Sequence, residues 1–206
     1  MHQQTEQQVE FIVEELGLGE GARVIDLACG RGRISIGLAQ RGMLVTGLDL
    51  SPRSLELAQA DADAAGVEID FVRRDMRELD ANGEFDAVVN VFTSFGYFPK
   101  QEEDEQVLAN VALALVSGGR FLLDMVNTIA IAKQFVEADW DELEDGTLWL
   151  QRRRYDQLTG RHEATWTFVR PDCSRSEILV SMPLSDSLAR CASASSAVRN
   201  APTCTK

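Results

Sequence analysis

The stretch "ARVIDLACGRGRISIGLA", residues 22–39, decides the fold. Its first part is an apolar run of the length of a buried strand, and Gly30 and Gly32 follow it with one residue between them. A helical pattern then begins, with Ile34 and Leu38 four residues apart. A strand, a glycine turn and a helix in this order form the usual cradle of a nucleotide-like ligand, because the first helical turn has backbone N–H groups to offer. The stretch therefore predicts a ligand site at the bend.

The first 125 residues continue to alternate between strand-like and helix-like patterns. One helix begins at Ser51 and Pro52, which are typical of a helix start, and stops at Gly66. Strands are expected at residues 43–49, 67–75, 85–92 and 120–126, and helices at 5–16, 33–41, 52–65 and 104–116, the last ending at Gly118–Gly119. Such alternation predicts an α/β fold, with a doubly wound, mostly parallel, Rossmann-like sheet covered on both faces.

The pattern changes after residue 140. Residues 147–172 fit two alternating strands around a turn at Leu158–Gly160, and residues 176–183 add a third strand. The last twenty residues show neither helical nor strand periodicity. We therefore expect three parts, which are a Rossmann-like domain over 1–140, a small antiparallel β appendage after strand five over 141–184, and a poorly ordered tail over 185–206.

Composition narrows the class of protein and of partner. Of the 206 residues 45% are hydrophobic and 26% charged, and no apolar run reaches the roughly 18 residues that span a bilayer. The first ten residues lack the regions of a signal peptide. The net charge of −13 argues against nucleic acid as a partner, because phosphate binding requires a basic face. The cysteines have neither paired nor metal-ligand spacing, and they are Cys29, Cys173, Cys191 and Cys204. We expect a cytoplasmic protein with no membrane partner and no metal site.

Polar residues stand where each expected strand ends. They are Asp26 to Gly32, Asp49, Asp75 and Asn90. Ligands of open parallel sheets bind beyond the carboxyl ends of the strands. A carboxylate at Asp49 can accept two hydrogen bonds from a ribose diol, and Asp75 can accept one from an exocyclic adenine amine. These residues predict a nucleoside-binding edge.

A dinucleotide is one alternative for the ligand. Its fingerprint has a third glycine three residues after the second, and Ser35 occupies that place here. The chain also lacks the Tyr-x-x-x-Lys pair of many NAD(P)-dependent oxidoreductases. An oxidoreductase is therefore disfavoured without being excluded.

The same residues resemble the class I S-adenosylmethionine-dependent methyltransferases. Five motifs, in order and at suitable spacing over about residues 5–127, carry the resemblance: "VIDLACGRGR" (24–33), "VTGLDLS" (45–51), "RRDMREL" (73–79), "FDAVVNVFTSFGYF" (85–98) and "LVSGGRFLLDMV" (115–126). Some bacterial members of unassigned substrate or with small-molecule acceptors also carry "FTSFGYF" before an inserted β hairpin. The resemblance implies methyl transfer from S-adenosyl-L-methionine to an unidentified, small-molecule acceptor.

The resemblance also implies the roles of individual residues. The methionine and ribose part of the cofactor would be lined by Asp26, Ala28, Cys29, Gly30 and Gly32. The ribose and adenine would be held by Asp49 and Leu50, the adenine by Asp75 and Met76, and the sulfonium end would lie beside Asn90 and Val91. A cationic sulfonium favours oxygen atoms nearby and no competing cation, which agrees with these residue types.

The acceptor and a catalytic residue are less defined. Phe92, Phe95 and Tyr97 lie where acceptors bind in this family, although they could equally pack the loop against the core. Methyl transfer is an in-line displacement in which positioning supplies much of the rate, so no dedicated base is assigned. The two histidines, His2 and His162, lie outside the motifs and are expected at the surface.

The family fold completes its sheet with two further strands. Residues 184–206 do not have the pattern to supply them, which suggests a truncated or frame-shifted product. A cofactor-binding but inactive remnant is therefore the alternative to an active methyltransferase.

Overall fold

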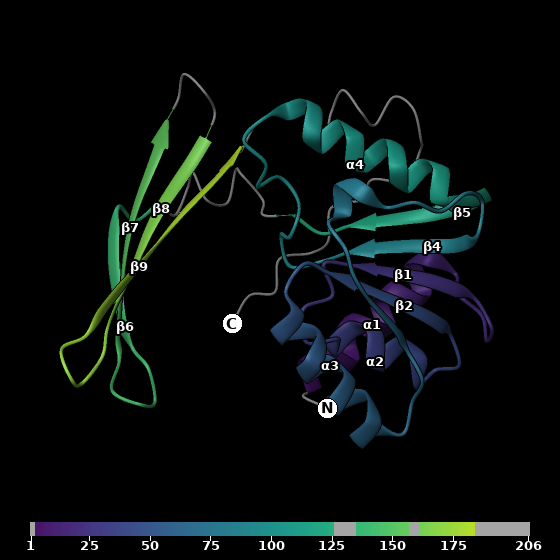
Figure 1. Cartoon of the computed structure of the whole chain (residues 1–206), viewed down its shortest axis with the longest axis horizontal. Coiled ribbons are helices and arrows are strands. Elements are labelled where there is room, and N and C mark those ends of the chain that lie inside the picture. The colour runs from purple at the N-terminus through teal and green to yellow at the C-terminus, as the bar shows by residue number, and fades with distance from the viewer. Residues whose placement is uncertain (1–2, 126–134, 157–160, 184–206) are drawn as a thin grey trace. The chain divides into compact units, whose positions relative to one another are not determined.

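A computed structural model of the chain describes residues 3–125, 135–156 and 161–183 (Figure 1). These residues form two compact units. The first comprises residues 3–95 and 100–125, and the second comprises 96–99 together with the described residues from 135 onward. No helix in the described ranges combines the length and apolar character needed to cross a membrane.

The first unit contains a five-stranded sheet. Its strands are β1 (Arg23–Leu27), β2 (Leu44–Asp49), β3 (Asp70–Arg73), β4 (Phe85–Asn90) and β5 (Leu115–Leu123), in the order β3-β2-β1-β4-β5. Its helices are α1 (Gln3–Leu16), α2 (Arg33–Ala39), α3 (Pro52–Ala65), α4 (Gln101–Ala114) and the short 3-10 helix η1 (Met76–Glu78). Every neighbouring pair of strands is parallel, which confirms the predicted doubly wound α/β sheet.

The strand order reverses at β1, and the helices divide between the two faces accordingly. The chain runs outward from β1 to β3 through α2 and α3, and from β4 to β5 in the other direction through α4. Because these crossovers are right-handed, opposite directions place the helices on opposite faces. Figure 1 shows α4 apart from α1, α2 and α3, with the sheet between them. The switch point where such sheets bind ligands therefore lies between β1 and β4.

An apolar core holds this edge in place. It draws side chains from α1, β1, α2, β2 and β4, among them Val9, Ile12, Val24, Ile34, Leu38, Val45 and Val89. Each such side chain contributes about 1.5–3 kcal/mol on full burial. The two helices α1 and α2 approach closely because α2 has a glycine at the contact: a Cβ on Gly37 would lie 2.6 Å from Cγ2 of Val9.

The predicted boundaries of α3 are confirmed by its caps. The Ser51 hydroxyl accepts a hydrogen bond of 3.2 Å from the Ser54 amide, and Pro52 is the first helical residue. The helix ends where Gly66 adopts a φ of 70°. A side-chain acceptor at the start and a left-handed residue at the end are the features that the sequence predicted.

The predicted end of α4 at Gly118–Gly119 is wrong. The helix ends at Ala114, and β5 begins at the next residue. The carbonyls of Leu113 and Ala114 accept hydrogen bonds from the amides of Gly83 and Glu84, at 2.8 and 3.0 Å, and this pairing opens the strand. Gly118, with a φ of 83°, then lies within β5 where the register with β4 shifts. The glycine therefore serves an irregularity in a strand, which is the other common use of a left-handed residue.

The second unit contains an antiparallel sheet in the order β6-β7-β8-β9. Its strands are β6 (Ala138–Glu142), β7 (Leu148–Asp156), β8 (Arg161–Val169) and β9 (Arg175–Pro183). The last three correspond to the predicted strands, whereas β6 was not predicted. Every residue of β6 is exposed, so its sequence "ADWDE" lacks the alternation that a half-buried strand shows. The predicted turn at 158–160 and the predicted tail lie outside the described residues.

Aromatic side chains pack this second sheet. The Trp149 ring meets Trp166 edge-on at 5.6 Å and stacks on Phe168 at 6.1 Å. His162 is buried and packs edge-on against Phe135 at 6.3 Å, so its expected surface position is wrong. It lies on the same sheet face as Trp166, since the two are four residues apart in one strand. Burial lowers the pKa of His162, which favours the neutral ring.

Candidate functional site

The carboxyl ends of β1, β2 and β3 are joined through Asp49. Its Oδ2 accepts a hydrogen bond from the Gly30 amide and its Oδ1 one from the Ser51 amide, both at 2.8 Å. The backbone carbonyl of Asp49 accepts a further bond of 3.0 Å from the Arg74 amide, just after β3. A carboxylate has about four acceptor positions, so this one retains capacity for a ligand. Asp49 therefore fixes the glycine bend and still presents oxygen atoms.

The bend after β1 is built from left-handed residues. Ala28, Gly30 and Gly32 have φ values of 62°, 55° and 71°. A Cβ on Gly32 would lie 2.9 Å from the ring of Phe71, so the bend packs tightly against β3 on that side. A Cβ on Gly30 would have nothing within 4 Å, so the backbone there is open to an approaching molecule. The bend thus has a packed side and an open side.

Behind the bend, a buried carboxylate joins β1 to α2. Asp26 is 2% exposed, and its Oδ2 accepts a bond of 2.5 Å from the Ser35 hydroxyl. Burial raises the pKa of Asp26 to about 6, against an ordinary value of 3.8. Burial also raises the pKa of the neighbouring Cys29 thiol, which disfavours a reactive thiolate. Both residues therefore have a structural part in the bend.

Asn90 ends β4 beside the bend and is fully buried. Its Nδ2 donates a hydrogen bond of 2.7 Å to the carbonyl of Leu27, which orients the side chain. Its Oδ1 is also buried and has no hydrogen-bond partner within the described part of the chain. Buried acceptors are nearly always paired in folded proteins. An unpaired buried oxygen of this kind calls for a partner, which a water or a ligand donor would supply.

The loop after β4 is strained and is fastened on both sides. Phe92 and Thr93 are consecutive non-glycine residues with φ values of 61° and 56°. The Phe92 amide donates to Oδ2 of Asp124 at 3.1 Å, and the Arg33 guanidinium lies 4.2 Å from the centre of the Phe92 ring. Arg33 also donates to Thr5 of α1 at 2.9 Å. Strain of this kind clusters at functional sites, where the surroundings hold it.

The residues predicted for the acceptor differ in exposure. Phe92 is 46% exposed and Tyr97 41%, whereas Phe95 is 5% exposed and packs into the protein. Burial raises the pKa of the Tyr97 phenol above its ordinary value, so it stays protonated. Phe92 of the first unit is therefore accessible to a ligand and Phe95 supports the loop, whereas Tyr97 belongs to the second unit.

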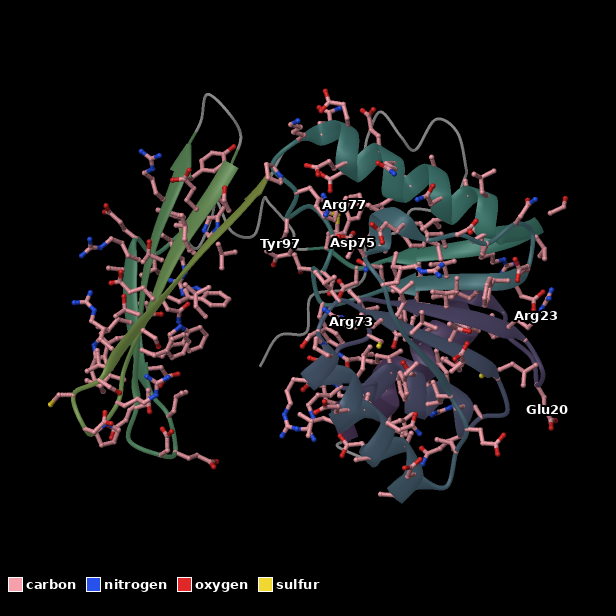
Figure 2. All side chains as sticks on the ribbon, in the orientation of Figure 1. Glu20, Arg23, Arg73, Asp75, Arg77 and Tyr97 are labelled. Carbon is pink, nitrogen blue, oxygen red and sulfur yellow. The ribbon has the colours of Figure 1, made fainter. Side chains whose placement is uncertain are left out.

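Asp75 lies just after β3 and caps η1 through a bond of 2.9 Å from the Arg77 amide. Figure 2 shows Asp75 and Arg77 next to each other at one end of the sheet, with Glu20 and Arg23 at the opposite end. Three predicted residues directly follow these polar positions. Leu50, after Asp49, is 61% exposed. Met76, after Asp75, and Val91, after Asn90, are half-buried.

Direct bonds link three of the predicted residues to the bend: Gly30 donates to Asp49, and Asn90 donates to the carbonyl of Leu27, which precedes Ala28. Sequence reasoning missed the site roles of four others, which are Arg33, Ser35, Arg77 and Asp124. The position of Ser35 between two isoleucines of α2, in "ISIG", is a weak signal that its hydroxyl is buried and needs a polar partner. The other three lie within the quoted motifs, at 24–33, 73–79 and 115–126, but nothing in their spacing marked them as residues that hold the site together.

Comparison with known proteins gives the site its context. Residues 24–119 match the family described as "Methyltransferase domain". The chain is 35% identical over 155 residues to the Bacillus subtilis (strain 168) protein named "Putative methyltransferase YqeM", covering 74% of this chain and 62% of that protein. A protein of Geobacillus sp. (strain WCH70) with the same description is 31% identical, over 82% of this chain and 69% of its own length. The chain thus spans about two thirds of the length of these relatives.

Solved structures share the fold at low sequence identity. An S-adenosylmethionine-dependent methyltransferase from Clostridium acetobutylicum superposes with a TM-score of 0.77 at 16% identity, over 92% of this chain and 78% of that one. The SAM-bound amino pentose methyltransferase CalS10 from Micromonospora echinaspora gives a TM-score of 0.68 at 22% identity, over 94% and 81%. The parallel sheet, its glycine bend and these sequence matches agree with one another. The chain belongs to the methyltransferase family of these curated relatives, and it has the fold of the S-adenosylmethionine-dependent methyltransferases.

Proposed function

We propose that the chain binds S-adenosyl-L-methionine at the carboxyl ends of β1 to β4 and transfers its methyl group to a small-molecule acceptor. The observation that carries this proposal is the unpaired Oδ1 of Asn90, buried beside the glycine bend. The cofactor has an ammonium group on its methionine part and N–H and O–H donors on its nucleoside. A buried neutral oxygen accepts such a donor at little further cost in free energy, because folding has already removed the water from it.

The remaining residues fit the other parts of the cofactor. The open backbone at Gly30 and the half-buried residues Ala28 and Cys29 would line the methionine part. Asp49, with acceptor capacity left, would take the ribose hydroxyls, and Leu50, at 61% exposure, would cover the adenine. Asp75 and Met76 would hold the adenine edge, while Val91 would lie beside the sulfonium end. Asp26 and Gly32 would act by holding the bend, because Asp26 is bonded to Ser35 and Gly32 is packed against Phe71.

The bound cofactor supplies an electrophilic methyl group on a cationic sulfur. The protein's part is to align an acceptor atom with that group and to keep competing water away. The exposed ring of Phe92 follows β4 and offers apolar surface to an acceptor. Arg33 rests on the Phe92 ring and is tied to α1, so the ring is held rather than free. These contacts support a small organic acceptor.

An oxidoreductase is disfavoured by Ser35. This residue stands where the dinucleotide fingerprint has its third glycine, and its hydroxyl is fully committed to the buried Asp26. In the fingerprint that third glycine lets the helix pack closely on the strand, whereas here a serine side chain bonded to β1 fills the place.

Calorimetric titration tests the proposal. We expect one molecule of S-adenosylhomocysteine to bind and NAD not to bind, and we expect methyl release on a panel of small acceptors. Asn90→Ala should weaken the binding about tenfold or more, since it removes the buried acceptor. Asn82→Ala, in an exposed turn at the other end of β4, is the matched control and should bind as the unaltered chain does. Binding of NAD alone would contradict the proposal, and cofactor binding without turnover on the whole panel would indicate an inactive remnant.

A further inference from the structure

Arg77 clamps Asp75 more firmly than a cap requires. Oδ1 of Asp75 accepts from the Arg77 amide at 2.9 Å and from its Nε at 3.0 Å, and Oδ2 accepts from its Nη2 at 2.6 Å. The two side chains are only two residues apart, so the guanidinium folds back onto the carboxylate. Bidentate pairs of this kind fix direction as well as distance. The plane of the Asp75 carboxylate is therefore set by Arg77.

The clamp is itself held by α4. Glu103 accepts a short hydrogen bond from Nη1 of Arg77. The backbone carbonyl of Arg77 accepts bonds from Gln106 at 3.1 Å and from Asn110 at 2.8 Å. Three side chains on successive turns of one helix thus engage a single residue of η1. Because α4 is anchored in the sheet through buried Val107 and Val111, the position of Arg77 is fixed by the fold.

The clamp leaves a defined acceptor on Asp75. Among the contacts of the described residues, three of the roughly four acceptor positions of the carboxylate are used, and the unused one is on Oδ2. The Arg77 hydrogen bonds also lower the pKa of Asp75, so this oxygen accepts and does not donate near neutral pH. An oxygen held in this way pairs with an N–H donor and repels a carbonyl.

We propose that Arg77 is the positioning residue for purine recognition, aiming the unused acceptor position on Oδ2 of Asp75 so that the site takes a 6-aminopurine and rejects a 6-oxopurine. This inference rests on the proposed function, because it assumes that Asp75 meets the purine edge of the cofactor. It goes beyond that function by assigning nucleobase selectivity to a residue that need not touch the base. The exocyclic amine of adenine is a neutral N–H donor, which matches the unused acceptor position on Oδ2.

The test compares two ligands that differ only at position 6 of the purine. S-adenosylhomocysteine and S-inosylhomocysteine are titrated by calorimetry, and the ratio of their dissociation constants is the readout. We expect the unaltered chain to prefer the adenosyl ligand about a hundredfold. Arg77→Leu should reduce this ratio about tenfold, because an unclamped carboxylate can rotate or hydrate. Arg23→Leu removes an arginine at the opposite end of the sheet, where it pairs with Asp86, and should leave the ratio unchanged (Figure 2).

The outcomes separate the inference from the function on which it rests. If Arg77→Leu weakens both ligands equally, its role is only structural and the inference is overturned. A ratio near one in the unaltered chain overturns it too, since Asp75 then does not read the purine. Absence of binding by either ligand refutes the proposed function itself. Should Arg77→Leu fail to fold, Arg77→Lys keeps the positive charge but loses the Nε and Nη2 donors that grip both oxygens of Asp75, and an unchanged ratio in that variant overturns the inference equally.

Discussion

The amide of Gly30 and Oδ2 of Asp49 form a hydrogen bond of 2.8 Å that joins the bend after β1 to the end of β2. The two residues are 19 apart in sequence, and the parallel pairing of β1 with β2 brings them together. The same carboxylate also accepts from Ser51 at the start of α3. Asp49 therefore holds the bend in place and also has acceptor positions for a ligand. Its substitution is expected to change ligand binding.

Asp49→Ala should weaken cofactor binding by about 1.5–3 kcal/mol, the range for hydrogen bonds to a charged group. The variant removes the acceptors for a ribose diol and frees the Gly30 amide. Calorimetry with S-adenosylhomocysteine measures the change. Asp63→Ala, an exposed residue near the end of α3, is the control and should bind normally. An unchanged dissociation constant in Asp49→Ala would show that the ribose lies elsewhere.

Gly32 and Gly66 allow backbone strain to be separated from close packing. Their φ values are 71° and 70°, so alanine is equally unfavourable in the backbone at both positions. Only at Gly32 would the new Cβ meet neighbours, at 2.9 Å from Phe71 and 3.1 Å from Ala58. We expect Gly66→Ala to lower the free energy of unfolding by about 1 kcal/mol and Gly32→Ala by about 1–3 kcal/mol more. Urea unfolding measures both, and equal losses would contradict the packing of the bend.

Asp26 should make the stability of the chain depend on pH. Its pKa is about 6 in the folded state and near 3.8 when exposed, so between these values the unfolded chain has lost a proton that the folded chain keeps. The free energy of unfolding therefore falls as the pH rises from about 4 to 6, by about 3 kcal/mol from this group. Asp26→Asn cannot ionise and should lack this component.

Unfolding curves at several pH values between 4 and 7 test the contribution of Asp26. As the pH rises over this range, the unaltered chain should lose unfolding free energy relative to Asp26→Asn, so the variant becomes more stable relative to the unaltered chain. Asp63→Asn, at an exposed position, should instead follow the unaltered chain. If the curves of Asp26→Asn and the unaltered chain run parallel, the buried carboxylate does not titrate as described.

The sheet and the bend could be predicted because local chemistry decides them. Apolar runs the length of strands, the helix start at Ser51–Pro52 and the paired glycines each have one dominant structural meaning. Gly118 shows where such local rules become ambiguous. A left-handed glycine can end a helix or break the register of a strand, and the pairing of Ala114 with Glu84 decides between them. That pairing joins residues 30 apart, which no local pattern reveals.

The fastening contacts of the site were not predictable for a similar reason. Ser35 matters because it faces Asp26, and Arg77 because α4 offers it Glu103. Each contact depends on the packing of one element against another rather than on spacing along one element. The exposed strand β6 was missed because it has no buried face to impose a period.

A crystal structure of the chain with S-adenosylhomocysteine tests the central claim most directly. The account predicts ribose hydroxyls within hydrogen-bond distance of the Asp49 carboxylate, and a donor of the ligand within the same distance of Oδ1 of Asn90. A ligand bound away from the carboxyl ends of β1, β2 and β4, or one that leaves Oδ1 of Asn90 unpaired, would contradict it.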